Sequence, residues 1–138
     1  SGAGRWRGGS GMVWEVRNLG GDARIATGSS DGDLTQPAGA AGGDPGPLSK
    51  MYIRRGDEIE TVRTHRMIEV KTGEVLGKVS GGGGGVGQPF EREPEAVQKD
   101  VVDGYVTIEA AERLYGVAID EATTTIDEDR TKRLRGID

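Results

Sequence analysis

Apolar residues recur along the first half of the chain in short runs that glycines and other turn-forming residues interrupt. Residues 12–17 alternate in part between apolar and polar side chains, which predicts a strand. Asn18 to Gly21 follow and predict a turn, because Asn and Gly tolerate positive φ. Residues 23–27 then predict a second strand. We expect these two strands to pair as a hairpin.

The most strand-like region spans residues 51–79, where apolar residues recur with short polar spacers. Turn signals at 55–57 and 71–74 divide this region, so it predicts two to four strands. His65, the single histidine, lies within it. A base or metal-ligand role for His65 needs partners, and the chain has no second His and no Cys, so we expect an ordinary strand residue.

The last 45 residues change to a helical pattern with capping residues at suitable positions. Proline is favoured in the first turn of a helix, Ser, Thr or Asp at the N-cap, and Gly just after the end. The predicted helices begin after Glu93, after Thr107, and after Thr125 or Asp127, and they end at Asp103-Gly104, Gly116 and Arg135.

Glycine takes 25 of the 138 positions, and only 33% of the residues are hydrophobic. Glycine loses more backbone entropy on folding than other residues. Burial of the small number of apolar side chains offsets little of that cost. We therefore expect the fold to depend on further protein. The segment from Gly28 to Pro47 has two interpretations, either disorder or ordered, polyproline-II-like backbone packed against other backbone.

These patterns predict a mainly β fold with irregular, glycine-rich, polyproline-II-like segments and two or three short C-terminal helices. We divide the chain into a glycine-rich β part over residues 1–93 and a short helical tail over residues 94–138.

Charge and composition exclude several function classes. The net charge is -5, and the sequence pI of about 5.0 argues against nucleic-acid binding, which favours basic proteins. Without Cys there are no disulfides or thiolate metal sites, which is compatible with the cytoplasm, where we expect the protein to be. No apolar run has the length of a membrane helix, so we expect no membrane partner.

Two features are candidates for binding chemistry. The run of five glycines over residues 81–85 lacks the Lys and hydroxyl residues of a phosphate-binding loop, which favours close backbone packing instead. Arg5 and Arg7 flank Trp6 in a glycine-rich setting, where a planar guanidinium could contact a substrate or another anion, or only pair with local acids. No metal site is predicted, and no catalytic residue is identified. The predicted structural glycines are Gly81, Gly82, Gly83, Gly84, Gly85 and Gly87.

Four motifs occur in the chain in a fixed order. Residues 2–11 match the pattern GAG-(R/K)-aromatic-RGG-x-G, and residues 42–46 are similar to a second glycine-proline turn. Residues 81–97 hold the glycine run followed by Pro, Glu-Arg, an acid and Pro. Residues 103–117 begin with Asp-Gly and end with Tyr-Gly-Val. This ordered set resembles the C-terminal segment of B-type subunits of the hydantoinase B family, which includes acetone and acetophenone carboxylases and 5-oxoprolinases.

The resemblance implies a fold and a setting. B-type subunits have a barrel-like pair of β-sheets that runs into a bundle of polyproline-II-like segments. They pair with a hydantoinase-A-type subunit whose actin-like fold binds ATP. ATP is thought to phosphorylate a substrate oxygen, and the B-type component then supports hydrolysis of a cyclic amide or carboxylation of a ketone.

From the resemblance we expect this chain to supply scaffold and subunit interface, and to be inactive alone. It would hold no cofactor itself. ATP and Mg are expected on the A-type subunit, and a divalent metal elsewhere in the complex is a further option. Its partners would be a small-molecule substrate, the remainder of a B-type polypeptide and the A-type subunit. The alternative is a non-catalytic assembly module of a hetero-oligomer.

Four departures from the family pattern bear on these expectations. Val86 stands where the family has an aromatic residue, and Gln88 stands where it has Asp. In the family these motifs end a polypeptide of several hundred residues, so we expect a fragment, a processed product or the product of a split gene. Residues 78–80 precede the glycine run with Lys-Val-Ser, which slightly favours the carboxylase branch.

Overall fold

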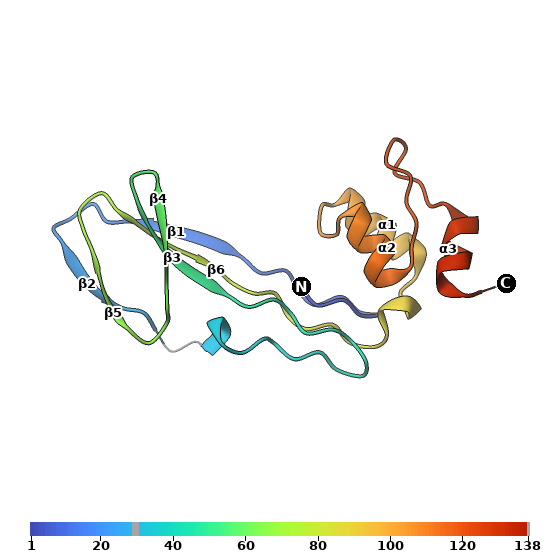
Figure 1. The fold of residues 1–138 in the computed structure, drawn as a ribbon, viewed down its shortest axis with the longest axis horizontal. Helices are drawn as coiled ribbons and strands as arrows, with labels where there is room; N and C mark the ends of the chain where they lie inside the picture. Colours follow the sequence, from blue (N-terminus) through green and yellow to red (C-terminus); the bar gives the residue numbers. More distant parts are fainter. Residues whose placement is uncertain (29–30, 138) are drawn as a thin grey trace. The chain divides into compact units, whose positions relative to one another are not determined.

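The protein is described by a computed structural model that covers residues 1–28 and 31–137 (Figure 1). Its contacts divide it into two compact units, each described here by itself. The glycine-helix unit comprises Ser1–Ser10, Ala38–Gly46 and Gly83–Asp138, and the strand unit comprises Gly11–Pro37 and Pro47–Gly82. The boundary that we expect at residue 93 stays a prediction.

The strand unit contains two antiparallel sheets. The larger has the order β1-β6-β3-β4, and the smaller pairs β2 with β5. A short 3-10 turn, η1 (Asp31–Asp33), follows β2. The strand bounds are β1 (Val13–Arg17), β2 (Ala23–Ala26), β3 (Lys50–Arg55), β4 (Glu58–Val62), β5 (Met67–Val70) and β6 (Val75–Val79).

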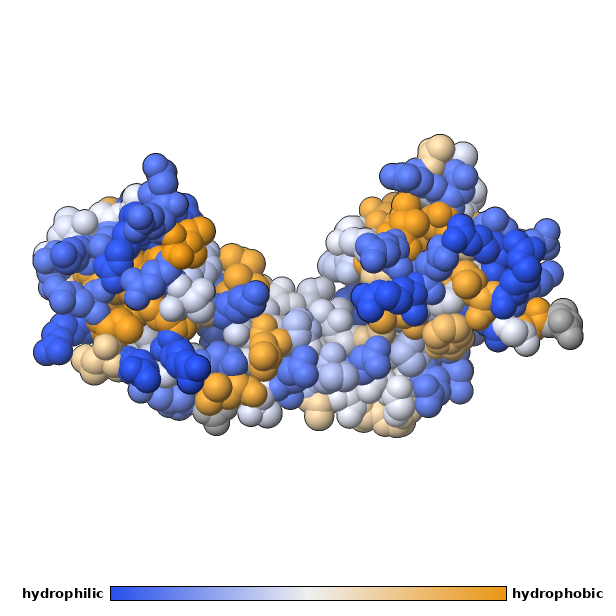
Figure 2. All heavy atoms as spheres, in the orientation of Figure 1, coloured by the Kyte–Doolittle hydropathy of each residue, from blue (hydrophilic) through white to orange (hydrophobic). Residues whose placement is uncertain are grey.

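Apolar side chains from both sheets form the core of the strand unit. Met51, Ile53, Val70 and Leu76 are buried together, and Trp14, Ile25, Val62 and Ile68 pack against them. Hydrophobic atoms also reach the surface over this part of the molecule (Figure 2). The sequence predicts two to four strands over residues 51–79, and the structure has four, from Lys50 to Val79. The two sheets are open, and no closed barrel occurs within residues 1–28 and 31–137.

The predicted hairpin between the first two strands is wrong. β1 pairs with β6, with Val13 opposite Val79, and β2 pairs with β5. The side chain of Asn18, just after β1, donates to the carbonyl of Val70 at 2.9 Å, and its N–H donates to Glu74. These bonds fix the turn between two different sheets, so the chain leaves one sheet and enters the other.

The glycine-helix unit begins with three extended segments, residues 1–10, 38–46 and 83–88, that lie backbone against backbone. The third segment bonds to both others, for example from Gly2 N–H to Gly83 at 2.8 Å and from Ala40 N–H to Gly85 at 2.9 Å. Residues 38–46 are therefore ordered, whereas Ser29 and Ser30 of the expected loop lie outside the described residues. The polyproline-II geometry of these segments stays a prediction.

Helices follow the third segment. They are the 3-10 turn η2 (Pro89–Glu91) and the helices α1 (Pro94–Val102), α2 (Ile108–Tyr115) and α3 (Glu128–Arg135). Thr107 caps α2 by accepting from the N–H of Ala110, as the sequence predicts. Of the two caps that the sequence offers for α3, Thr125 and Asp127, the structure has Asp127, which accepts from the N–H of Arg130. None of the helices in the described part of the chain has the length and apolar character needed to cross a membrane.

A second hydrophobic core joins these helices to the first extended segment. Its buried members are Ala3, Val97, Ala111, Tyr115, Val117 and Ile119. Because Ala3 belongs to the first segment and Val97 to α1, burial of apolar surface holds the glycine segments and the helices in one unit.

Candidate functional site

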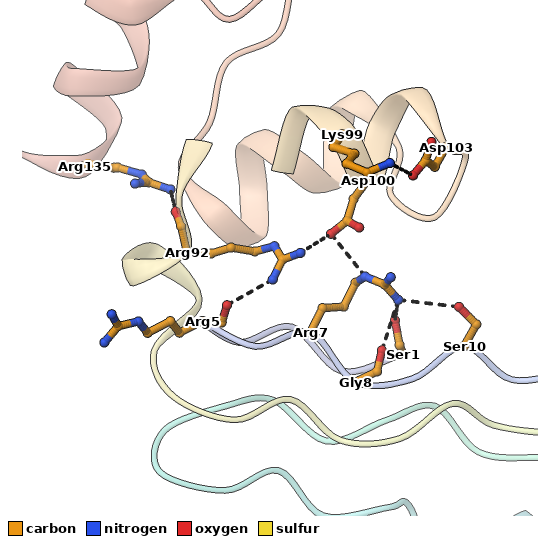
Figure 3. A network of polar contacts seen from close by, with 10 residues as sticks. All are labelled: Ser1, Arg5, Arg7, Gly8, Ser10, Arg92, Lys99, Asp100, Asp103 and Arg135. Carbon is orange, nitrogen blue, oxygen red and sulfur yellow. Dashed lines mark hydrogen bonds and ion pairs between the residues drawn. The ribbon is translucent and has the colours of Figure 1, made fainter. Parts of the chain in front are cut away.

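A charged network lies where α1 meets the extended segments of the glycine-helix unit (Figure 3). The carboxylate of Asp100, on α1, accepts from Nε of Arg7 at 3.1 Å and from an NH2 nitrogen of Arg92 at 2.8 Å. The Asp100 side chain is 9% exposed, and those of Arg7 and Arg92 are 15% and 14% exposed. Two arginines thus share one carboxylate away from most solvent.

Arg7 makes further contacts that fix its plane. Its Nη1 atom donates to the carbonyl of Gly8 at 3.0 Å and to the hydroxyl of Ser1 at 3.3 Å. Its guanidinium carbon lies 4.6 Å from the centre of the Tyr105 ring, a cation–π distance. Hydrogen bonds and ring packing therefore hold the guanidinium against the Asp100 carboxylate.

Arg92 links the network to the chain on either side of it. Its NH1 group donates to the carbonyl of Arg5 at 3.0 Å, and its own carbonyl accepts from Arg135 at 2.7 Å. Arg135 also donates from Nε to the carbonyl of Tyr115 at 3.1 Å, which ties α3 to the end of α2. Burial is the main cause that lowers the pKa of Arg135 and raises the pKa of Tyr115.

The network holds more positive than negative charge. Arg7 and Arg92 share the one carboxylate of Asp100, Arg135 bonds to the carbonyl of Arg92, and Nε of Arg92 is a buried donor without a hydrogen-bond partner among the described residues. Removing one member of a buried ion pair is costly because it leaves the other charges uncompensated. The arrangement of these charges therefore supports a structural role, in which the ion pairs hold the helices against the glycine segments.

The two arginines predicted from the sequence differ in their surroundings. Arg5 is exposed, and its guanidinium carbon lies 6.0 Å from the centre of the Trp6 ring. The anion that Arg7 contacts is the Asp100 carboxylate of its own chain. Contact of either arginine with a substrate stays a prediction.

Asp100 and Arg92 are the members of the network that sequence reasoning missed. Asp100 follows Val97 by three positions and precedes Val101 by one, so it lies on the apolar face of α1. An acid on such a face is the one signal that could have identified it, because a buried carboxylate needs a partner.

The glycine run allows direct contact between backbones. A Cβ atom added to Gly84 would lie 2.0 Å from the carbonyl oxygen of Ala38, and one added to Gly85 would lie 2.0 Å from that of Ala3. The N–H groups of Gly83, Gly85 and Val86 donate to backbone carbonyls of the neighbouring segments. These amides are therefore already occupied, unlike those of a phosphate-binding loop.

Val86 and Gln88, which depart from the family pattern after the glycine run, flank Gly87. Val86 pairs with Trp6 and Ala40 in isolated bridges. The Gln88 amide lies against Gly42, where an added Cβ atom would be 2.4 Å from its Nε2 atom. A neutral amide therefore fills the position of the acid in the family motif.

His65 is not a strand residue, so that expectation is wrong. It lies between β4 and β5, where the chain reverses, with a φ of 57°, and its N–H donates to the carbonyl of Thr27. Nearby Asp33 accepts from the Thr64 hydroxyl at 2.6 Å, and this bond is the first cause of its lowered pKa. Within the described residues no group of His, Asp and Glu could hold a metal ion.

A groove of about 720 Å³ lies on another side of the helices. Its apolar lining comes from Phe90, Ile108 and Leu134. Three carboxylates and one arginine line it as well, namely Glu109, Glu112, Glu121 and Arg113. A concave surface whose lining combines apolar side chains with a few charged groups is typical of a binding site.

Comparisons with known proteins agree with the motifs. The family model described as Hydantoinase B/oxoprolinase matches residues 1–89. The putative B-type subunit of the D-/L-hydantoinase of Pseudomonas sp. (strain NS671) is 35% identical over 99% of this chain and 23% of that protein. The beta subunit of the caprolactamase of Pseudomonas jessenii is 36% identical over 86% of this chain and 21% of that protein. The chain thus spans about a quarter of these relatives.

Solved structures show the same fold. The crystal structure of the ATP-dependent caprolactamase from Pseudomonas jessenii is similar over 97% of this chain and 24% of that chain, with a TM-score of 0.75 and 33% identity. A nucleotide-free acetone carboxylase is similar over 71% of this chain, with a TM-score of 0.58 and 22% identity, which shows the fold alone.

Proposed function

Because the chain belongs to the hydantoinase B/oxoprolinase family, we propose that it is a segment or small subunit of a hydantoinase-B-type component in an ATP-dependent complex. The complex would hydrolyse a cyclic amide or carboxylate a ketone. The observation that carries the proposal is the similarity to caprolactamase over 97% of this chain, which accounts for only 24% of the caprolactamase chain.

In this proposal the chain supplies scaffold and subunit interface. Two features support that role. The glycine segments contact one another without intervening side chains, and the pairing of Asp100 with Arg7 and Arg92 anchors the helices on them. The groove lined by Phe90, Ile108 and Leu134 offers one surface for a neighbouring protein.

The chemistry would lie outside this chain. We infer that ATP and Mg are held by an A-type subunit, and that the active-site residues belong to that subunit or to the remainder of the B-type component. A divalent metal elsewhere in the complex is an option. The chain alone would be inactive, and its location would be the cytoplasm.

The names of the relatives favour cyclic-amide hydrolysis. Two of the relatives that align with most of this chain are named as subunits of a hydantoinase and of a caprolactamase, and a third, from Methanocaldococcus jannaschii, has a name that states no activity. The acetophenone carboxylase delta subunit of Aromatoleum aromaticum is 39% identical but covers only 39% of the chain. The greater coverage by the hydantoinase and caprolactamase subunits outweighs the slight preference for carboxylation that residues 78–80 indicate.

Native mass spectrometry of the tagged chain purified from its host tests the proposal. We expect a hetero-oligomer that contains both a further B-type polypeptide and an ATP-binding subunit, and that hydrolyses ATP when a lactam or hydantoin is added. A hetero-oligomer without ATP-dependent activity would favour the alternative of a non-catalytic assembly module. A lone 14.5 kDa species would contradict both.

A further inference from the structure

The free edge of β1 is the strongest unpartnered surface of the strand unit. β1 is the first strand in the order β1-β6-β3-β4, so one of its edges has no neighbour in this sheet. The N–H of Ser80 donates to Met12, and the N–H of Asn18 donates to Glu74, on the β6 side. Inward and outward residues alternate in an antiparallel ladder. The N–H and C=O groups of Val13, Glu15 and Arg17 therefore face the free edge.

Apolar side chains accompany these backbone groups. Val13 is 64% exposed, and Met12, Val16 and Leu19, in or next to the same strand, are exposed as well. The two charged residues of β1 are held within the strand unit. Glu15 accepts from the Tyr52 hydroxyl at 2.6 Å and pairs with Arg54, and Arg17 donates to the carbonyl of Gly73 at 2.9 Å.

The opposite edge of the same sheet has a different character. β4 carries Glu58 and Glu60, and Asp57 precedes it. Charges on an edge strand discourage pairing with another strand. Both charged side chains of β1 bond within the strand unit and have opposite signs, whereas β4 carries two acids. Ile59 of β4 is 65% exposed, so the two edges expose an apolar residue equally and differ in charge.

We propose that the β1 edge receives a β-strand from the remainder of the hydantoinase-B-type polypeptide. This inference rests on the proposed function. The relatives have roughly three quarters of their length outside the part that this chain matches, which leaves ample polypeptide to supply the strand. The added strand pairs its backbone with Val13, Glu15 and Arg17 and places apolar side chains over Val13 and Val16.

Val13→Pro tests the proposal with little change to the chain itself. The substitution removes an N–H that faces outward and leaves the bonds to β6 in place, and edge strands tolerate Pro at such positions. Val13→Lys places a charge on the same edge and serves as a second variant. Ile59→Lys is the matched control, because it changes an equally exposed residue on the charged edge.

The tagged wild-type chain and the three variants are purified from the host, and native mass spectrometry quantifies the B-type polypeptide that accompanies each. We expect the amount of B-type polypeptide that accompanies each Val13 variant to fall about tenfold or more, and the amount that accompanies Ile59→Lys to equal that of the wild type. Equal retention by wild type and both Val13 variants would overturn the inference while leaving the proposed function intact. If the wild-type chain brings no B-type polypeptide, both proposals fail.

Amide hydrogen exchange provides a readout that unfolding does not imitate. In the isolated chain, Trp14 and Val16 should exchange slowly because they bond to β6, whereas Val13, Glu15 and Arg17 should exchange fast. In the complex all five amides should be slow. Fast exchange at the three outward amides in the complex would overturn the proposal, and so would their protection by a second copy of this chain.

Discussion

The Asp100 carboxylate lies 3.1 Å from Nε of Arg7, a residue 93 positions earlier in the chain. Together with the apolar contact of Ala3 and Val97, this ion pair connects α1 to the first extended segment, and Arg92 binds the same carboxylate. Both ends of the ion pair are largely buried, so its loss cannot be compensated by solvent.

Asp100→Asn should destabilise the chain strongly. The amide leaves Arg7 and Arg92 buried without a counter-charge, and breaking a buried ion pair costs about 3–5 kcal/mol. The urea midpoint of unfolding measures the effect. The control is Asp103→Asn, whose partner Lys99 is 74% exposed, and it should change the free energy of unfolding by less than about 1 kcal/mol. Equal midpoints for the two variants would show that the network does not hold the helices.

Gly85→Ala should also destabilise the chain, for a steric reason. The added methyl would lie 2.0 Å from the carbonyl oxygen of Ala3, a backbone atom that can move only with its segment. Overpacking of this kind costs about 1–3 kcal/mol or more. Thermal unfolding measures it, with Gly9→Ala as the control because a Cβ atom there meets nothing within 4 Å. A loss at Gly9 as large as that at Gly85 would contradict the steric explanation.

Local signals predicted the helical part well. The caps Thr107 and Asp127 and the left-handed Gly116 lie where the sequence places them, because capping depends on residues a few positions apart. The strand positions were also predicted, since alternation is local. Strand pairing was not, because the register of Val13 with Val79 depends on residues distant in the sequence.

The charged network around Asp100 also depends on contacts between residues that are distant in the sequence. The glycine-rich setting of Arg7 marks it as a candidate in the sequence, but no spacing rule links it to its partner Asp100 so far along the chain. His65 was expected in a strand, but it has a φ of 57° and its N–H bonds to Thr27, again a distant contact. The glycine motifs predicted close packing, and the segments that they contact could only be found in the structure.

Arg5→Ala and Arg7→Ala should separate the two arginines that flank Trp6. Arg5 is exposed, so its replacement should change the stability of the isolated chain by no more than about 0.5 kcal/mol. Replacing Arg7 removes a charge-assisted hydrogen bond to Asp100 and should cost about 1.5–3 kcal/mol. Urea unfolding compares the variants, and equal midpoints would contradict the different surroundings of the two side chains.

The same pair tests the predicted anion contact in the assembled complex. If Arg5 contacts an anionic group of the substrate, Arg5→Ala should raise KM without a change in the unfolding midpoint, and Arg5→Lys should restore part of the loss. An unchanged KM in Arg5→Ala would remove Arg5 from the substrate contacts.

The pKa of Asp33 should depend on Thr64. The Thr64 hydroxyl donates to Asp33 at 2.6 Å, and hydrogen bonds from this residue lower the Asp33 pKa below its ordinary value of 3.8. Because the pKa is lower in the folded state, the resulting stability is present above the unfolded pKa and is lost as pH falls through the folded pKa. The stability difference between the wild type and Thr64→Val should therefore be constant near neutral pH and shrink below about pH 4.

Carboxyl chemical shifts in an NMR titration measure the effect directly, and the Asp33 pKa should move upward in Thr64→Val. The backbone N–H of Thr64 also donates to Asp33, at 3.1 Å, so part of the depression should remain. Asp120 is the internal control, since its own lowered pKa arises chiefly from Thr123 and should not respond. An Asp33 pKa that stays at its wild-type value would show that the Thr64 hydroxyl does not stabilise the charged carboxylate.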